Sequence, residues 1–158
     1  MHHRTHDEHP ANARARAAFA VASWAAVVAV AAFIFAMSAK DGVTLDTNSG
    51  LLSAAKAWLA ATAEQLFGQR VDVSPIGHFA EYLLFGAVLA NAVRLHVPLR
   101  RAVWLAPLIA SLYGITDEIH QIFVPMRSCD PADWLVDTVA AVIGAAVVAA
   151  LVKKRSNC

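Results

Sequence analysis

Charged residues are scarce in this chain. Aspartate, glutamate, lysine and arginine make up 16% of the 158 residues, whereas hydrophobic residues make up 58%. A soluble globular domain has about a quarter charged residues and nearly half apolar ones. The composition therefore favours lipid as the solvent of the folded chain. The length leaves little sequence for a separate soluble module.

An excess of charge of one sign is also missing, and so is any abundance of cysteine. The net charge is +1 and no long basic stretch occurs, so nothing indicates nucleic-acid binding. The two cysteines are Cys129 and Cys158. They are expected on opposite sides of the membrane in the topology derived below, which argues against an internal disulfide.

Four apolar segments are long enough to cross a bilayer as helices, which takes about 20 residues each. They are predicted at residues 17–37, 76–95, 103–124 and 132–152. A cleavable signal peptide is the alternative for the first segment, but its apolar region normally runs about 7 to 15 residues. Short links make the last three spans antiparallel neighbours. The predicted fold class is an all-α integral membrane protein, a four-transmembrane-helix bundle over residues 17–152.

The remaining segments are predicted to flank this bundle. Residues 1–16 are expected to be a disordered tail, and residues 153–158 a second, shorter tail. The first tail carries unevenly spaced histidines that offer metal binding as a weaker alternative: His2, His3, His6 and His9. In the loop after the first span, apolar residues recur at spacings of three and four over 51–67. This pattern predicts an amphipathic helix that lies on the bilayer surface or packs over the helix ends.

The distribution of lysine and arginine predicts the orientation, because these residues are enriched in cytoplasmic loops. With the N-terminus inside, the basic residues of 1–16, 94–101 and 153–158 are cytoplasmic. Only four of the 13 lysines and arginines are then outside: Lys40, Lys56, Arg70 and Arg127. Both termini are therefore predicted to be cytoplasmic.

In this orientation, polar and ionisable residues gather near the outer ends of three spans. They are His78, Glu81 and Tyr82 on the second span, Asp117, Glu118, His120 and Gln121 on the third, Asp133 and Asp137 on the fourth, and Arg127 in the last loop. Ionisable residues in membrane spans are costly and typically functional. Spacings of three and four place most of them on shared helix faces, while Glu118 points away from the stripe on its own helix. We expect them to line one polar pocket that opens toward the cell exterior.

The residue types in this layer leave several chemistries open. His78, Glu81, Asp117 and His120 are ligand types that suit zinc or manganese, although their spacing is not a recognised zinc signature. No cofactor is firmly implied. A histidine beside a carboxylate can also serve in acid–base catalysis, and Arg127 can hold a phosphate or carboxylate. The same groups can instead form a network that only fixes helix pairing.

Two stretches resemble the VanZ-like family of bacterial membrane proteins. They are HFAEYLLFG, His78–Gly86, and DEIHQIFVPMRSCDPADWLVD, Asp117–Asp137. The chain departs from the family pattern at Pro75, Met126 and Ala140. The resemblance implies a multi-pass protein of the bacterial inner membrane, whose namesake is associated with low-level resistance to the glycopeptide teicoplanin.

The leading hypothesis for function is that the polar pocket engages an outer-leaflet lipid, a cell-wall precursor or a lipoglycopeptide. A membrane-embedded hydrolase or transferase acting on a lipid headgroup or phosphate ester is the first alternative. In that case His78 or His120 would be the acid or base. A proton-coupled small transporter and a structural scaffold are further alternatives. Whether the protein is an enzyme stays open at this point.

Overall fold

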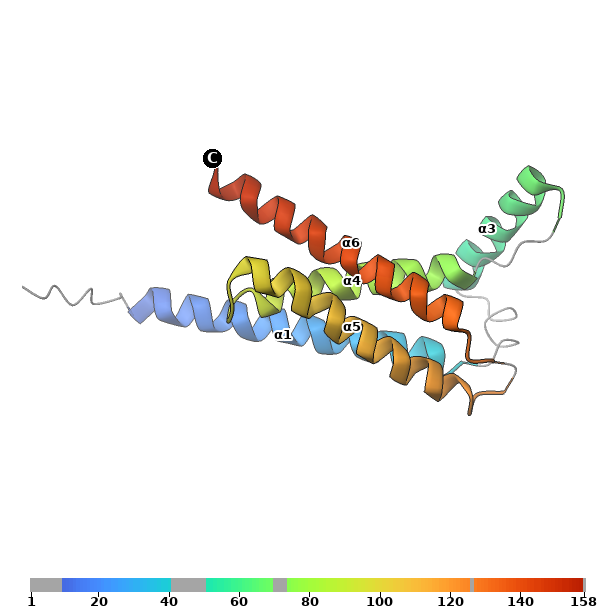
Figure 1. Ribbon diagram of the computed structural model, residues 1–158, viewed down its shortest axis with the longest axis horizontal. Helices are drawn as coiled ribbons and strands as arrows, with labels where there is room; N and C mark the ends of the chain where they lie inside the picture. The colour runs from blue at the N-terminus through green and yellow to red at the C-terminus, as the bar shows by residue number, and fades with distance from the viewer. Residues whose placement is uncertain (1–9, 41–50, 70–73, 126, 158) are drawn as a thin grey trace, which may run out of the picture.

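The computed structural model describes residues 10–40, 51–69, 74–125 and 127–157, and none of these residues lies in a β-strand. The helices are α1 (Pro10–Ser38), α3 (Leu51–Phe67), α4 (Ser74–Val93), α5 (Leu99–Gln121) and α6 (Pro131–Ser156). All of them except α3 are long and apolar enough to cross a membrane. These four form one elongated bundle, with α3 beside one of its ends (Figure 1). The predicted all-α membrane fold is confirmed.

Two helices extend beyond the predicted spans. α1 begins at Pro10, so the prediction of a disordered segment is wrong for residues 10–16, while residues 1–9 lie outside the described part. Proline fits the first turn of a helix, and the alanines that follow are the strongest helix formers. α6 likewise continues to Ser156 through Lys153, Lys154 and Arg155. Cations in a last turn stabilise the helix because they oppose its dipole.

The boundaries of α5 also differ from the hydropathy pattern. The helix begins at Leu99 rather than at residue 103, with Pro98 as the residue before it, and it ends at Gln121. Hydropathy excluded the first turn because it contains Arg100 and Arg101. Charged side chains do not prevent a helix, so the backbone turns begin before the apolar segment does.

Small residues bring α4 and α6 into close contact, the most extensive between any two helices. A Cβ atom on Gly86 would overlap the carbonyl oxygen of Ala141 and lie 2.6 Å from its Cα. A Cβ on Gly144 would overlap the carbonyl oxygen of Leu83 and lie 2.9 Å from the nitrogen of Ala87. Membrane helices associate through such close backbone packing at small residues. We call this contact the glycine seam.

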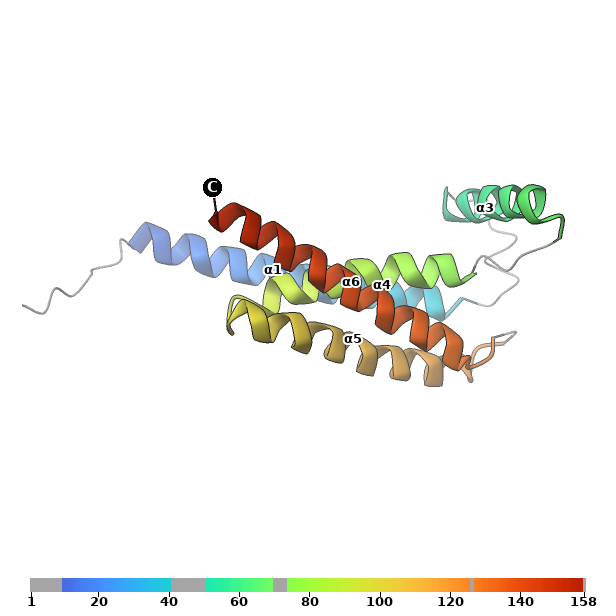
Figure 2. The same ribbon diagram turned by 45° about the horizontal axis from the view of Figure 1, so that its top comes forward.

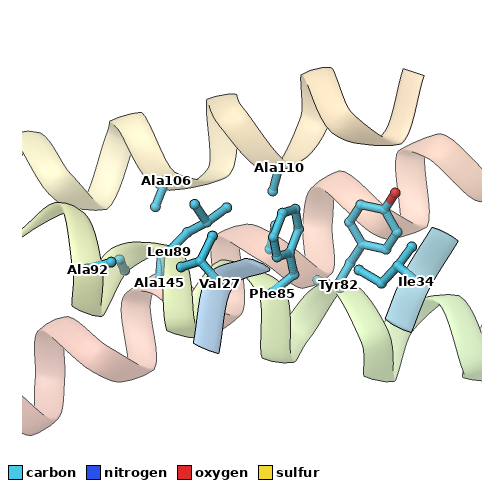
Figure 3. Close-up of a cluster of buried hydrophobic side chains, with 12 residues drawn as sticks. Val27, Ile34, Tyr82, Phe85, Leu89, Ala92, Ala106, Ala110 and Ala145 are labelled. Carbon is cyan, nitrogen blue, oxygen red and sulfur yellow. The ribbon is translucent and has the colours of Figure 1, made fainter. Parts of the chain in front are cut away.

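The interior of the bundle is built around α4, which contacts α1, α5 and α6. Its side chains Tyr82, Phe85 and Leu89 are buried in the centre. Figure 3 shows them between residues of the other spans, with Val27 and Ile34 contributed by α1 and alanines by α5. α4 is therefore the central helix, and it fixes the positions of the polar residues near its first turns.

The outer surface of the four spans is apolar. Large hydrophobic side chains on every span are exposed, among them Val28, Leu84, Leu112 and Val147. In water such a surface would be unfavourable, whereas in a bilayer these side chains contact lipid. The few polar groups in the middle of the bundle pair between helices, as in the 2.8 Å hydrogen bond that Tyr113 donates to the carbonyl oxygen of Ala31.

The predicted amphipathic helix is present as α3, with the predicted bounds. It ends at Phe67 and is followed by Gly68, whose positive φ of 68° is favourable for glycine and whose N–H donates to the carbonyl oxygen of Glu64. Figure 2 places α3 beside the end of the bundle where α4 begins. Trp58 and Leu66 are exposed on it. Its position on the bilayer surface stays a prediction.

Candidate functional site

One end of the bundle gathers the ends of all four spans. The last turns of α1 and α5 and the first turns of α4 and α6 lie together there, and the opposite end holds the start of α5 and the end of α6 (Figures 1 and 2). With a rise of 1.5 Å per residue, even Asp137 lies only about 9 Å from the first residue of α6. The polar residues from distant parts of the sequence therefore occupy the same depth.

His78 of α4 and Asp137 of α6 form the centre of this end. His78 Nδ1 lies 3.3 Å from Asp137 Oδ1. His78 is 8% exposed and Asp137 is fully buried. The two helices bring these residues together because the glycine seam, one to two turns farther along, holds their backbones in contact.

Glu118 connects α5 to the beginning of α6. Its Oε2 accepts a 2.7 Å hydrogen bond from the backbone nitrogen of Asp130. Asp130 in turn caps α6, since its carboxylate accepts from the backbone nitrogen of Ala132 at 2.8 Å. The buried Glu118 carboxylate is thus held toward α6, away from the polar stripe of its own helix, as the helical phase predicted.

Asp117 occupies the other side of α5, toward the end of α1. The amide of Gln121 lies 3.4 Å from Asp117 Oδ2 and 3.5 Å from Glu118 Oε1, so it joins the two carboxylates by long contacts. Ser38, the last residue of α1, lies beside Asp117. No motif in the sequence signalled Ser38; only its position at the end of the first span could have suggested a role.

The remaining predicted residues surround this centre. Glu81 lies within electrostatic range of His78, Asp117, Asp137 and Arg127. Tyr82 is fully buried, and its hydroxyl lies near Gly114.

His120 and Asp133 complete the set. His120 stacks on Phe35 with ring centroids 4.6 Å apart, and it lies within electrostatic range of Asp117. Asp133 interacts with His78 and Glu118. All the residues predicted as site residues therefore lie in one group, which we call the polar cluster.

Many buried atoms of the polar cluster and of the adjoining Ser38 have no hydrogen-bond partner among the residues that the structure describes. They are Ser38 Oγ, His78 Nδ1, Tyr82 OH, Asp117 Oδ1, His120 Nε2, Arg127 Nε and both carboxylate oxygens of Asp137. These atoms come from all four spans and from the last loop. Buried polar groups in native proteins are nearly always hydrogen-bonded, and leaving one unpaired costs about 1–3 kcal/mol.

The residues closest to a metal-binding geometry differ from the predicted ones. Among the described residues, the ligand atoms of His78, Glu118 and Asp137 lie within 4.8 Å of one another, and all three residues are buried. Of the four ligand candidates from the sequence, only His78 belongs to this group. Glu81, Asp117 and His120 belong to the polar cluster but lie outside it.

The family model described as VanZ/LLP1 matches residues 23–152. This range includes the glycine seam and every residue of the polar cluster, and it includes neither of the tails at residues 1–16 and 153–158. No curated protein and no solved structure matches the chain. The match covers most of the sequence and agrees with the resemblance of its two polar stretches. The chain belongs to the VanZ/LLP1 family.

Proposed function

We propose that this VanZ-like membrane protein binds the polar part of an outer-leaflet lipid, a lipid-linked cell-wall precursor or a lipoglycopeptide in the polar cluster. The set of unpaired buried atoms carries the proposal, because it contains donors as well as acceptors and every span contributes at least one atom. A sugar or phosphate group offers the complementary acceptors and hydroxyl donors. A link to teicoplanin-type resistance follows if the ligand is the glycopeptide or its target.

The half-buried members of the polar cluster are the ones that a ligand meets first. Glu81, His120 and Arg127 keep part of their surface exposed. The planar guanidinium of Arg127 suits a phosphate or carboxylate, which it can hold by two parallel hydrogen bonds. The large apolar side chains of Ile122 and Phe123 are exposed on the neighbouring turn. A ligand with a polar head and an acyl chain matches this adjacency of polar and apolar surface.

The orientation is part of the proposal: the polar cluster faces the cell exterior, and both termini face the cytoplasm of a bacterial inner membrane. Cys129, which is exposed in the loop at the polar end, provides the test. In a Cys158→Ser variant, a membrane-impermeant maleimide should label Cys129 in intact spheroplasts as completely as in permeabilised ones. The Cys129→Ser, Cys158→Ser variant is the unlabelled control. If Cys129 is labelled only after permeabilisation, the polar cluster faces the cytoplasm and the proposed orientation is wrong.

Thermal unfolding of the detergent-purified protein tests ligand binding. The probes are phosphatidylglycerol, a lipid-linked peptidoglycan precursor and teicoplanin, each added separately. A ligand at about 100 times its Kd stabilises the native state by about 2.7 kcal/mol, so at least one probe should raise Tm by several degrees. The Glu81→Gln, Asp117→Asn variant should lose most of this rise, because it removes two acceptors of the cluster.

Glu64 provides the matched control for that experiment. It is an exposed carboxylate on α3, outside the polar cluster, so Glu64→Gln should leave the rise in Tm unchanged. Equal increases in the wild type and the Glu81→Gln, Asp117→Asn variant would mean that the polar cluster does not bind the probe.

The contact between His78 and Asp137 favours a second candidate function, hydrolysis or transfer at a lipid phosphate ester. A carboxylate 3.3 Å from Nδ1 stabilises the imidazolium that forms when Nε2 takes a proton from a reacting group. The same incubations decide between the candidates. If the wild type releases phosphate or a headgroup and the His78→Gln variant does not, the protein is an enzyme. If the ligand is recovered unaltered, the protein only binds it.

A further inference from the structure

We propose that His78, Glu118 and Asp137 form a binding site for a divalent metal ion of the zinc or manganese type. The proposal concerns an ion rather than the lipid or glycopeptide ligand, and it holds whether or not that ligand binds. The three residues come from α4, α5 and α6, so one ion would join three of the four spans. We call this group the buried triad.

The spacing of the buried triad suits a small cation. Its ligand atoms lie within 4.8 Å of one another, and His78 Nδ1 and Asp137 Oδ1 are 3.3 Å apart. Two ligand atoms bound at about 2.1 Å to a tetrahedral zinc ion are about 3.4 Å apart. The His78 and Asp137 atoms already have this separation. The Glu118 ligand atom lies within 4.8 Å of the other two, so it would have to move by up to about 1.4 Å to reach the same separation.

The atoms of His78 and Asp137 that would bind the ion lack hydrogen-bond partners. His78 and Asp137 are more than nine-tenths buried, and His78 Nδ1 and both Asp137 oxygens make no hydrogen bond to any described residue. The two side chains are in ion-pair range, but their geometry does not form a hydrogen bond. A metal ion would use the lone pairs of all these atoms at once.

The charge of the surroundings also favours a cation. The polar cluster contains the carboxyl groups of Glu81, Asp117, Glu118, Asp133 and Asp137. Their neighbours of opposite charge are Arg127 and, when protonated, the two histidines. An excess of buried carboxylates is unfavourable unless a cation compensates them. A divalent ion between Glu118 and Asp137 would supply that compensation at the most buried point.

Glu118 is already oriented in the manner of a metal ligand. The backbone nitrogen of Asp130 donates to its Oε2 at 2.7 Å. An ionised carboxylate has about four lone-pair positions, so it can accept this bond and still bind an ion. Ligating carboxylates and histidines are typically held by such outer hydrogen bonds. Three protein ligands also leave a coordination position open to water or to an anionic group.

Metal binding to the purified full-length chain tests the proposal directly. The protein is stripped with EDTA, dialysed against Zn²⁺ or Mn²⁺, and analysed for bound metal by elemental analysis and titration calorimetry. The expected result is one ion per chain and a higher Tm for the loaded protein. Glu118→Gln and Asp137→Asn should each weaken binding at least tenfold.

Glu81→Gln is the matched control. It removes one carboxylate charge from the same cluster without removing a ligand of the buried triad, so it should weaken binding of the ion clearly less than Glu118→Gln does. If Glu81→Gln weakens binding as much as Glu118→Gln does, the ion is held by diffuse negative charge and the proposed triad is wrong. Absence of bound metal from folded wild-type protein would overturn the proposal outright.

A spectroscopic measurement on the wild type covers the case in which a triad variant fails to fold. X-ray absorption of the zinc-loaded protein should show one imidazole nitrogen and otherwise oxygen ligands, and no sulfur. Two imidazoles would instead implicate a second histidine, and a sulfur ligand would implicate a cysteine; either result contradicts the triad. Measuring the ligand-induced increases in Tm again in EDTA distinguishes this proposal from the proposed function. Metal binding can fail while the lipid or glycopeptide ligand still raises Tm, and the reverse can also occur.

Discussion

Replacing Gly86 with alanine is expected to destabilise the bundle, whereas the same replacement at Gly77 on the same helix is not. A Cβ at position 86 would overlap the backbone of Ala141, and rigid backbone atoms cannot move aside as a flexible side chain can. Forcing an extra carbon into such a contact typically costs about 1–3 kcal/mol. We expect the upper half of that range, measured as the free energy of unfolding in mixed detergent micelles with increasing SDS.

Gly77 makes the comparison strict because nothing lies within 4 Å of the position that its Cβ would occupy. Alanine is the better helix former by about 1 kcal/mol, so Gly77→Ala should leave the bundle as stable as the wild type or slightly more so. If both variants lose the same stability, the loss comes from the helix backbone and not from the glycine seam.

Replacing Asp137 with leucine is expected to have the second large effect, and replacing His78 at the same time should reverse most of it. Asp137→Leu leaves a buried imidazole facing an apolar side chain. Removing one partner of a buried pair typically costs about 3–5 kcal/mol, whereas replacing both partners with apolar groups is often neutral or stabilising. The free energies of unfolding of Asp137→Leu and His78→Leu, Asp137→Leu should therefore differ by several kcal/mol.

This measurement is made in EDTA, so that no metal ion contributes to the stability of the wild type. Asp137→Asn provides an intermediate case because it keeps the size and the hydrogen-bonding ability of the side chain while removing its charge. A double variant that is no more stable than Asp137→Leu would show that pairing with His78 is not what the carboxylate contributes.

Hydropathy and helical periodicity were sufficient to predict the membrane fold. Each span needs an apolar stretch of membrane length, and such stretches are visible in the sequence without any knowledge of their neighbours. The amphipathic helix α3 was predicted with its observed bounds for the same local reason. The first residues of α1 were predicted wrongly because hydropathy reports where the lipid ends, whereas backbone hydrogen bonding continues as far as Pro10.

The contacts between the site residues were less predictable than the fold. Spacings of three and four identify which residues share a helix face, but they do not identify the helix that each face contacts. The pairing of His78 with Asp137 and the turn of Glu118 toward α6 depend on where α4 and α6 cross. That crossing is set by Gly86 and Gly144, which are far apart in the sequence and belong to no recognisable motif together.

The glycine seam also determines how α6 can move. α4 and α6 approach most closely at this crossing, so a change in their crossing angle keeps the crossing in place and moves both ends of α6. Asp137 lies about 10 Å from Gly144 along the helix axis, and Arg155 lies about 16 Å away on the other side. A tilt of α6 that displaces its carboxylate by 1 Å therefore swings the basic terminus in the opposite direction by roughly half as much again. The seam is thus the pivot of α6, and it couples a displacement at one face of the membrane to an opposite displacement at the other.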